Sequence, residues 1–402
     1  MRSKANNRFQ AGSAIGWIFA FFFSLFSIPT QTNAQEYRST HDGIDYAAIE
    51  HRIGDDPVRI KLLRLDTTKV RLDVIHAMDA ALGTERTSSI ARRHGAVAAI
   101  NAGFFRLDTS IFAGDAASLL TIDGRLLSES SNGRAAIAIN NQGGQSRVAF
   151  GRVQTRLSLY TGKDPALPVA GVNRERKENE IIIFTKEFGR TTLTDPNGSE
   201  FIVRSGAEDG YFGKVISERS MYGSTEIPRD GFVVSASGGF SPELSRRFRN
   251  RNLKWRVGVE MSGNGGPLDP AFHTAEDIVA GVPQLIKDGK IDIDWEREGS
   301  SKAFVETRHP RTAVAKLSDG RLLFVTVDGR QPGVSVGMNL IELAEYLLAL
   351  DAVDAINLDG GGSTTMYLDG KVVNTPSDKT GERKVSDAIL IKLRNTRVLK
   401  TK

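Results

Sequence analysis

The sequence contains no cysteine. This absence excludes a disulfide framework, a thiol nucleophile and a metal site with cysteine ligands. The six histidines do not pair at the spacing of zinc ligands, so we expect no zinc site. No Gly-Lys-Ser or Gly-Lys-Thr follows a glycine run, which excludes a P-loop.

Long apolar runs are also missing beyond the first 34 residues, so no later segment is expected to span a membrane. Those first residues have a basic head (Arg2, Lys4 and Arg8), an apolar core over 15–28 and a small-residue run ending at Ala34. This pattern predicts a signal peptide over 1–34, removed on export. An uncleaved anchor is the alternative, but the core is shorter than the roughly 20 residues that a spanning helix needs. We expect a periplasmic or secreted protein without stable membrane insertion.

The positive charge is not strong evidence for a nucleic-acid partner. The formal net charge is +5, and the first 34 residues contribute three positive charges and no negative one, which leaves 5 − 3 = +2 for the rest. We therefore expect no nucleic-acid binding. The 402 residues show no internal repeat and no low-complexity linker. We interpret 35–94 as a strand-rich N-terminal extension and 95–396 as the main domain.

Strand and turn signals dominate the body of the chain. An Asp-Gly pair followed by Arg or Lys separates apolar runs at Asp123, Asp288, Asp319 and Asp369. Asp-Gly suits the tight turns of β-hairpins, in which the φ angles are positive. Few segments have helical periodicity. The predicted fold class is α+β, with β-rich mixed sheets, many hairpins and a C-terminal strand–helix–strand crossover.

The crossover consists of two apolar runs, 322–327 and 355–358, and an amphipathic helix over 340–350. A strand, a helix and a second strand predict a right-handed crossover and a parallel pair. Both runs end in Asp-Gly, at Asp328 and Asp359. Parallel strands present their carboxyl ends at the same edge of a sheet, where α/β sheets bind ligands.

Three glycines follow Asp359, which no ordinary hairpin turn requires. They indicate a loop in which the backbone approaches a ligand closely or adopts positive φ. Asp328 could instead belong to a plain turn, like the four other Asp-Gly sites. Glu342 lies three residues after Asn339 and could simply cap the helix, although it would do so at the same edge.

A basic stretch, 307–312, precedes another strand and contains His309 and Arg311. Arginine suits bidentate binding of phosphate or carboxylate, but a solvated basic loop explains the stretch equally well. Carboxylates cleave glycosidic bonds, and arginines with loop amides hold phosphate oxygens. A bond between a sugar and a phosphate would use all three kinds of group.

The motifs resemble those of the phosphodiester glycosidase family, which includes the uncovering enzyme for mannose-6-phosphate markers and bacterial exopolysaccharide-associated proteins. The segments that carry the resemblance lie in order across about 95–393 and are 101–105, 171–174, 308–312, 327–330, 340–344, 357–364 and 373–376. The family is that of the N-acetylglucosamine-1-phosphodiester alpha-N-acetylglucosaminidase domain. Ala102 departs from the second glycine that is usual in the family.

The resemblance implies hydrolysis of a sugar-1-phosphodiester at the anomeric carbon, with release of a free sugar and a phosphomonoester. It implies a sugar-phosphate or polysaccharide substrate and a place in cell-surface or exopolysaccharide metabolism. The implied catalytic residues are Asp359, Asp328 and Glu342. The implied substrate- and phosphate-binding residues are Arg311, Arg330, His309, Asn101, Phe105, Asn173, Gly360, Gly361, Gly362, Ser363 and Asn374.

Two other functions stay open at this point. A non-catalytic polysaccharide-binding module would bind sugar phosphates and leave them intact. A metal-dependent phosphodiesterase would use Asp328 and Asp359 as oxygen ligands for Mg²⁺ or Ca²⁺. We expect no cofactor and name no metal ligand, with Mg²⁺ or Ca²⁺ as the alternative.

Overall fold

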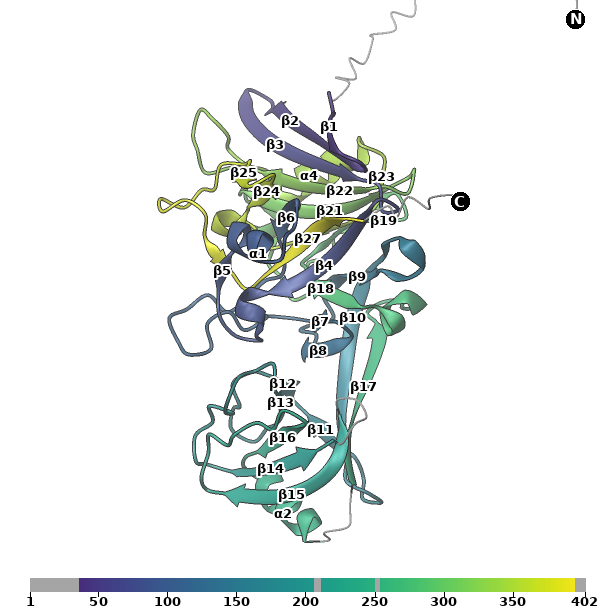
Figure 1. Cartoon of the computed structure of the whole chain (residues 1–402). Helices are drawn as coiled ribbons and strands as arrows, with labels where there is room; N and C mark the ends of the chain where they lie inside the picture. The colour runs from purple at the N-terminus through teal and green to yellow at the C-terminus, as the bar shows by residue number, and fades with distance from the viewer. Residues whose placement is uncertain (1–35, 206–210, 250–253, 395–402) are drawn as a thin grey trace, which may run out of the picture. The chain divides into compact units, whose positions relative to one another are not determined.

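The computed structural model describes residues 36–205, 211–249 and 254–394 (Figure 1). The predicted signal peptide, 1–34, lies outside these ranges. Residues Glu36–Lys402 form one unit, distinct from Met1–Gln35. None of the described helices is long and apolar enough to cross a membrane. Strands account for 45% of the described residues and helices for 13%, which confirms the β-rich α+β class.

The first sheet has eight strands, all paired antiparallel. Its strands, in spatial order, are β1 (Arg38–His41), β2 (Ile44–Ile53), β3 (Asp56–Leu65), β22 (Leu322–Val327), β21 (Arg311–Leu317), β23 (Ala352–Asn357), β19 (Gln284–Lys287) and β20 (Lys290–Ile291). Strands from the N-terminal 65 residues thus pair directly with strands from the C-terminal third. The 35–94 boundary itself stays a prediction.

The predicted crossover is partly wrong. Strands β22 and β23 run in the same direction and α4 (Leu340–Leu348) connects them, but they do not pair with each other. Strand β21 lies between them and pairs antiparallel with both. The tight turn at Asp319 makes β21 and β22 a hairpin, and this local partner occupies the edge that the sequence assigned to β23. Both carboxyl ends still reach the same edge of the sheet.

The second sheet has twelve strands. In spatial order they are β12 (Gly171–Val172), β13 (Ile181–Thr185), β16 (Gly231–Ala236), β14 (Ser199–Arg204), β15 (Phe212–Ser220), β17 (Lys254–Gly263), β10 (Arg147–Tyr160), β9 (Ala135–Asn140), β18 (Asp277–Ala280), β7 (Leu120–Ile122) and β8 (Arg125–Ser128), with β11 (Leu167–Val169) on β10. The long strands β10 and β17 lie side by side (Figure 1). In the ranges given above, only β12 and β13 pair in parallel.

A third sheet and the helices complete the fold. The third sheet contains β25 (Lys371–Val372), β24 (Met366–Leu368), β6 (Ala98–Asn101), β27 (Asp387–Leu393) and β4 (Val70–His76), and β26 (Lys384–Val385) pairs with β5 (Glu85–Arg86). The other helices are α1 (Thr87–Arg93), α2 (Phe240–Phe248) and α3 (Lys302–Glu306), and the 3₁₀ helices are η1 (Ala77–Asp79), η2 (Gln142–Gly144), η3 (Pro270–Thr274) and η4 (Gly361–Ser363).

The central strands β21 and β22 of the first sheet are buried on both faces, which explains their nearly continuous apolar sequences. Val314 and Phe324 point into a core shared with the second and third sheets. The alternate residues, such as Val325 and Ala355, pack against Leu343 and other apolar residues of α4. This alternation follows from the two-residue repeat of a strand. The strand ends between these two cores carry the candidate site.

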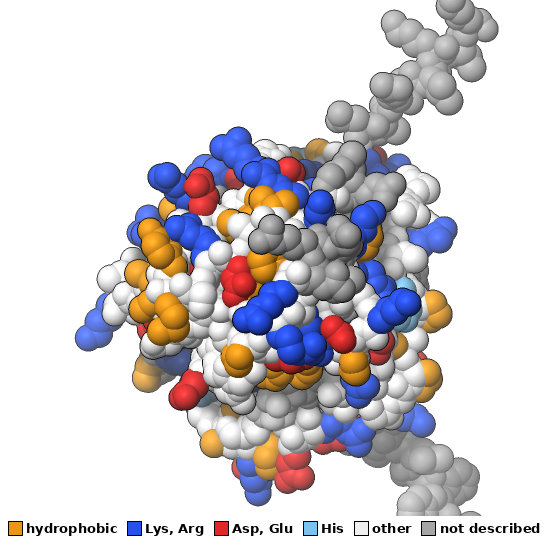
Figure 2. Space-filling view, turned by 90° about the horizontal axis from the view of Figure 1, so that it is seen from below, with side chains coloured by type: hydrophobic (Ala, Val, Ile, Leu, Met, Phe, Trp, Pro, Cys, Tyr) orange, Lys and Arg blue, Asp and Glu red, His pale blue; other side chains and the backbone are white. Residues whose placement is uncertain are grey.

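Charged side chains cover the surface in mixed sign. Figure 2 shows one face, on which Lys and Arg side chains lie among Asp and Glu side chains. Many of the surface charges form pairs, such as Arg246 with Glu243 and Arg321 with Asp319. Arginines that lack an acidic partner therefore stand out from the others.

Candidate active site

Asp359 follows β23 and is held by its backbone. The Asp359 amide donates to the carbonyl of Ala102 at 2.9 Å, and Asn101 Nδ2 donates to the Asp359 carbonyl at 2.6 Å. Its carboxyl group is half-buried. Burial raises the pKa of Asp359 to about 7, although Ser363, Arg383 and the Gly360 amide oppose the rise. The group therefore titrates near neutral pH, as acids and bases of active sites do.

Asp328 follows β22 and is almost fully buried, with 1% of its surface exposed. Its Oδ1 accepts hydrogen bonds from the Thr375 amide at 2.9 Å and from Asn374 Nδ2 at 3.2 Å. Its Oδ2 has no partner. Burial raises the pKa of Asp328, and the Thr375 amide, Asn374 and Lys61 act against it. One carboxylate oxygen is thus fixed, and the other is left for a ligand or water.

Two of the three asparagines predicted to bind substrate, Asn101 and Asn374, hold the site together. Asn101 Oδ1 accepts from Thr312 Oγ1 at 2.8 Å and from the Thr365 amide at 3.0 Å. Asn374 donates to Asp328 and to the carbonyl of Thr364 at 3.1 Å, and its Oδ1 accepts from the Met366 amide. Both side chains are buried and their polar atoms are used within the protein. Their direct role with substrate stays a prediction.

Arg311 begins β21 and is only 1% exposed. Its guanidinium donates to the carbonyls of Met338, Phe304 and Thr307, and it lies 4.9 Å from the centre of the Phe304 ring. No carboxylate pairs with it in the described part of the chain. Burial and the nearby Arg330 lower the pKa of Arg311 to about 9, against the attraction of Glu342.

Arg330, like Arg311, has no acidic side-chain partner among the described residues. Its backbone φ is +61°, an uncommon left-handed conformation for a residue with a side chain. Its Nη2 lies 3.4 Å from His309 Nδ1. Burial, Arg311 and Arg330 lower the pKa of His309, so the ring is neutral at pH 7. Two guanidiniums and a neutral imidazole therefore converge without a counterion.

The three glycines after Asp359 are needed for three different reasons. A Cβ on Gly360 would lie 2.8 Å from the carbonyl oxygen of Pro310. Gly361 has φ +61°, and a Cβ there would touch Arg330 at 3.0 Å. A Cβ on Gly362 would collide at 2.2 Å with Arg383 and its ion-pair partner. Close approach and positive φ, the two needs inferred from the sequence, are thus both present.

The expected cradle of unused amides is not what this loop presents. The Gly361 amide donates to the carbonyl of Pro310 at 2.8 Å, and the Ser363 amide donates to Gly360 at 3.1 Å. The Gly360 amide interacts with the Asp359 carboxyl. Because the chain itself uses these amides, phosphate binding through them stays an unsupported expectation. The two guanidiniums are the available cationic donors.

Glu342 has the capping role that was the simpler interpretation of its position. Asn339 Oδ1 accepts from the amides of Ile341 and Glu342, and the Glu342 carboxylate accepts from the Asn339 amide. Arg308 binds both oxygens of the same carboxylate. The carboxylate is therefore fully engaged by the protein, and its predicted catalytic role stays without a contact to support it.

Two further predicted residues have no bond to this group. Asn173 is completely buried near β12, where its side chain bonds only to Thr185, with φ +55°. Phe105 is half-buried and bridges to Ala116. The neighbouring Phe104 was missed: its ring packs edge-on against Phe304 at 6.1 Å, beneath Arg311. Nothing in the sequence distinguished the two phenylalanines.

Sequence reasoning also missed Asp387 and Arg383. Asp387 is buried at the start of β27, and its charge raises the pKa of Asp359, whereas Arg383 lowers it. Neither stood out in the sequence, because Asp387 lies in an ordinary strand and Arg383 in a charged loop. Burial is the property that marks Asp387, and the sequence alone did not reveal it.

Several buried oxygen atoms in this region have no hydrogen-bond partner. The side chains concerned are those of Thr326, Asp328, Asn357, Ser363, Thr364, Thr365 and Ser377. Buried polar atoms without a partner are rare and usually indicate a missing ligand or water. The edge formed by β22, β23 and the loops after them thus carries polar atoms whose hydrogen-bonding capacity the chain alone does not satisfy.

The same residues do not assemble a metal site. In the three described ranges, no group of three or more His, Asp or Glu side chains is placed to hold a metal ion. Ca²⁺ takes six to eight oxygen ligands, whereas Mg²⁺ keeps several waters and is usually held by one or two carboxylates together with substrate phosphates. The expectation that the protein needs no cofactor stays a prediction.

Comparison with known proteins identifies the domain. Residues 197–392, which include both carboxylates, match the model of the phosphodiester glycosidase family. This part of the chain belongs to that family. The two weaker motifs of the phosphodiester glycosidase resemblance, 101–105 and 171–174, lie before the matched range.

Two curated relatives of the domain are mammalian N-acetylglucosamine-1-phosphodiester alpha-N-acetylglucosaminidases. The mouse protein is 36% identical over 164 residues, which cover 38% of this chain and 30% of the relative. The bovine protein is 29% identical over 297 residues, 66% of this chain and 54% of the relative. The chain spans about half the length, or less, of these relatives.

Solved structures share the fold of the phosphodiester glycosidase chain. A hypothetical protein from Synechocystis has a TM-score of 0.73 at 24% identity, covering 90% of this chain and 64% of that one. A protein of Burkholderia pseudomallei, named as exported, has a TM-score of 0.69 at 24% identity, covering 85% and 75%. At this identity the likeness concerns the fold alone.

Proposed function

We propose that the protein is an exported hydrolase that cleaves the anomeric bond of a sugar-1-phosphodiester and releases a free sugar and a phosphomonoester. The observation that carries the proposal is the pairing of two unlike groups at one sheet edge. Arg311 and Arg330 have no acidic partner in the described residues, and Asp328 and Asp359 are carboxyls with raised pKa values. Such an arrangement suits a substrate with an anion beside a bond that carboxyl groups cleave.

Phosphate binding follows from charge balance. A buried guanidinium without a counterion is costly, and a phosphate would supply the missing negative charge. Arginine binds phosphate through two parallel hydrogen bonds. We assign Arg311 and Arg330 to the phosphate, with His309 beside them. The positive charges would also stabilise the phosphomonoester as it leaves, so strong protonation of the leaving group is less necessary.

We assign Asp359 to the anomeric carbon, as the base that activates water or as the nucleophile. With a water nucleophile, its oxygen bonds to the anomeric carbon, the bond to the phosphate oxygen breaks, and a water proton moves to Asp359. A carboxyl with a pKa of about 7 is partly ionised at neutral pH and can accept a proton. Asp328, with one oxygen unpaired, would orient the sugar or the water.

Product analysis on a panel of UDP-sugars and other sugar-1-phosphodiesters tests the proposal. A free sugar and a phosphomonoester are expected. A sugar phosphate and an alcohol would instead mean phosphodiesterase chemistry, and intact substrate with measurable binding would mean a polysaccharide-binding module. The assay is repeated in EDTA, where we expect unchanged turnover, because the described residues contain no group of three or more His, Asp or Glu side chains placed to hold a metal ion.

Export and a role in cell-surface or exopolysaccharide metabolism complete the proposal. Export is inferred from the basic head and apolar core of residues 1–34. The metabolic role is inferred from the resemblance to the phosphodiester glycosidase family. N-terminal sequencing of the protein recovered from outside the cytoplasm is expected to begin just after Ala34. Recovery of the full-length chain in the membrane fraction would contradict cleavage.

A further inference from the structure

Asp387 is connected to Asp359 by a short run of backbone. The carbonyl of Asp387 accepts from the Ala102 amide at 3.2 Å, and the carbonyl of Ala102 accepts from the Asp359 amide at 2.9 Å. The carboxylate of Asp387 reaches the same segment, because its Oδ1 accepts from the Gly103 amide at 2.5 Å. Asp387 thus holds residues 102–103, and residue 102 holds Asp359.

The glycine at 103 is what allows this approach. A Cβ at Gly103 would lie 3.2 Å from Asp387 Oδ2 and 3.3 Å from Oδ1, closer than nearly all such contacts. Ser386 Oγ donates to Oδ2 at 2.9 Å, so both carboxylate oxygens are fixed. The buried carboxylate is therefore built into the segment behind Asp359.

A histidine faces Asp387 from the other side. His76, at the end of β4, is 2% exposed. Burial raises the pKa of Asp387, and the charge of His76, the Gly103 amide and Ser386 oppose this rise. The ring nitrogens of His76 lie 3.1 Å from the carbonyl oxygens of Ala77 and Gly114. Both nitrogens can donate to these oxygens only when the ring carries two protons. A cation at this position would balance a carboxylate at Asp387.

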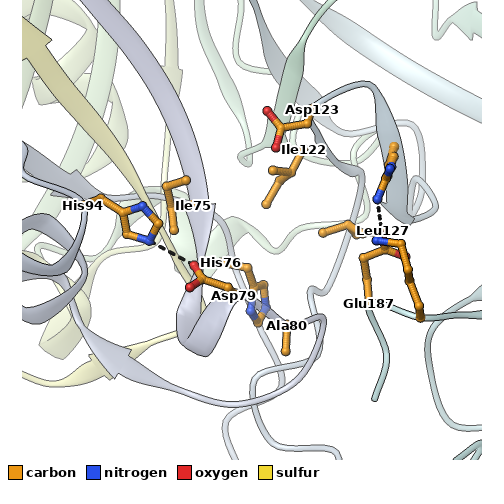
Figure 3. Close-up of a pocket in the computed structure, with 11 residues that line it drawn as sticks. Ile75, His76, Asp79, Ala80, His94, Ile122, Asp123, Leu127 and Glu187 are labelled. Atoms are coloured by element: carbon orange, nitrogen blue, oxygen red, sulfur yellow. Dashed lines mark hydrogen bonds and ion pairs between the residues drawn. The ribbon is translucent and has the colours of Figure 1, made fainter. Parts of the chain in front are cut away.

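His76 also lies on the wall of a pocket of about 460 Å³, whose other lining residues include His94 and Asp79 (Figure 3). In Figure 3, His94 and Asp79 point toward each other at the rim, and they are 2.9 Å apart. We assign no ligand to this pocket. Its relevance is that His76 lies next to a space that solvent can enter.

We propose that Asp387 is a positioning residue for Asp359, which it holds through Ala102 and Gly103 while it places a second negative charge beside the Asp359 carboxyl. The groups that face this pair are Arg383 and Ser363 on the side of Asp359, and His76 and Ser386 on the side of Asp387. A neighbouring like charge disfavours ionisation and keeps a carboxyl protonated to higher pH. The inference rests on the role of Asp359 in the proposed function.

The test is Asp387→Asn, which keeps an acceptor for the Gly103 amide and removes the charge. The titration of the Asp359 carboxyl is followed by NMR with ¹³C-labelled aspartate, and its resonance is assigned by its loss in Asp359→Asn. We expect the midpoint to fall by about half a pH unit or more, because one like charge is gone. The pH limb of kcat/KM on a sugar-1-phosphodiester should shift in the same direction.

Asp277→Asn is the matched control. Asp277 is also buried, accepts from two backbone amides, those of Val74 and Asp123, and has its pKa raised to about 7 by burial. It has no bond to the 102–103 segment. We expect it to change stability without moving the Asp359 midpoint.

An unchanged Asp359 midpoint in folded Asp387→Asn would overturn the proposal, as would an equal shift in the control. If Asp387→Asn does not fold, the unsubstituted protein is titrated instead. The chemical shift of Asp359 plotted against pH should then show a second inflection, caused by the titration of Asp387. A curve with a single step would overturn the proposal. The NMR titrations need no substrate. If the protein cleaves no phosphodiester but Asp387→Asn still shifts the Asp359 midpoint, only the proposed function is refuted.

Discussion

Two arginines of this protein, Arg174 and Arg311, lie in segments that carry the family resemblance, yet their surroundings are opposite. Arg174 bonds to the carboxylates of Glu129 and Glu180 and to two backbone carbonyls. Arg311 bonds to carbonyls alone and has no carboxylate partner in the described residues. The first charge is balanced inside the protein, and the second is left for a ligand.

The comparison separates two uses of a charged side chain that look alike in sequence. Around Arg174, burial of a charge is compensated by partners on neighbouring loops, so the cluster holds β12 and the 171–180 segment together. At the sheet edge, the charges of Arg311 and Arg330 repel each other and lower the pKa of Arg311. Residues that the fold leaves uncompensated are the stronger candidates for binding.

The largest effect is expected from Asp359→Asn. Removal of a general base or nucleophile should lower kcat by roughly 1000-fold or more. Folding should be intact, since the backbone bonds to Ala102 and Asn101 do not involve the carboxyl. Turnover on a sugar-1-phosphodiester and circular dichroism would measure the two effects. Near-normal turnover would remove Asp359 from the mechanism.

Substitution of the two kinds of arginine tests the comparison directly. Arg330→Gln should raise KM for a phosphodiester substrate roughly tenfold or more, as one charged hydrogen-bond donor is lost. Arg174→Gln should leave KM nearly unchanged and lower the free energy of unfolding by about 2 kcal/mol, because two carboxylates lose their partner. Kinetics and thermal unfolding are measured on both variants. A raised KM in Arg174→Gln and an unchanged KM in Arg330→Gln would mean that the cluster around Arg174 binds the phosphate.

How much of this was accessible from sequence depends on the kind of residue. The helix at 340–348, its cap and the turns at the four Asp-Gly hairpins were predicted, because local periodicity and turn chemistry determine them. The position of Asp328 and Asp359 at the same edge of the sheet was predicted, although the parallel pairing from which it was inferred is wrong. The insertion of β21 between their strands was not, because strand order depends on contacts distant in sequence.

The bonding partners of each predicted residue could also not be predicted from the sequence. The partners of Asn173 and Glu342, Thr185 and Arg308, lie twelve and 34 residues away from them. Asp387 has no motif of its own, and only its burial beside Gly103 makes it visible. Partners of this kind come from the packing of separate loops, which no local pattern encodes.

A smaller effect is expected on the pH dependence of stability at Asp115, which lies near Arg174 and its carboxylate partners. Burial and Glu129 raise the pKa of Asp115 to about 7, and Arg174 and Arg106 oppose this. The folded pKa exceeds the unfolded one, so the stability that it contributes is complete below about pH 4 and is lost as the pH rises through 7. Asp115→Asn should therefore raise Tm at pH 8 by a few degrees and leave it unchanged at pH 4. A gain at both pH values would contradict this assignment.

The smallest effect is expected from Glu342→Gln. The capping box and the pair with Arg308 would be weakened, at a cost of about 1 kcal/mol in the free energy of unfolding. We expect kcat to fall less than about tenfold, because the carboxylate is engaged by its own helix and by Arg308. Chemical denaturation and steady-state kinetics would measure both. A loss in kcat of a hundredfold or more would restore Glu342 as a catalytic residue.

The position of β21 has a consequence for how the site can fail. Arg311 is paired with Val327, and the next residue, Thr312, points the other way and bonds to Asn101. A slip of one residue in the register of this strand would exchange the two faces and bring a hydroxyl to the place of a guanidinium. The Asp319–Gly320 turn, at the far end of the hairpin, sets that register. An ordinary tight turn thus decides which side chain lies at the proposed phosphate site.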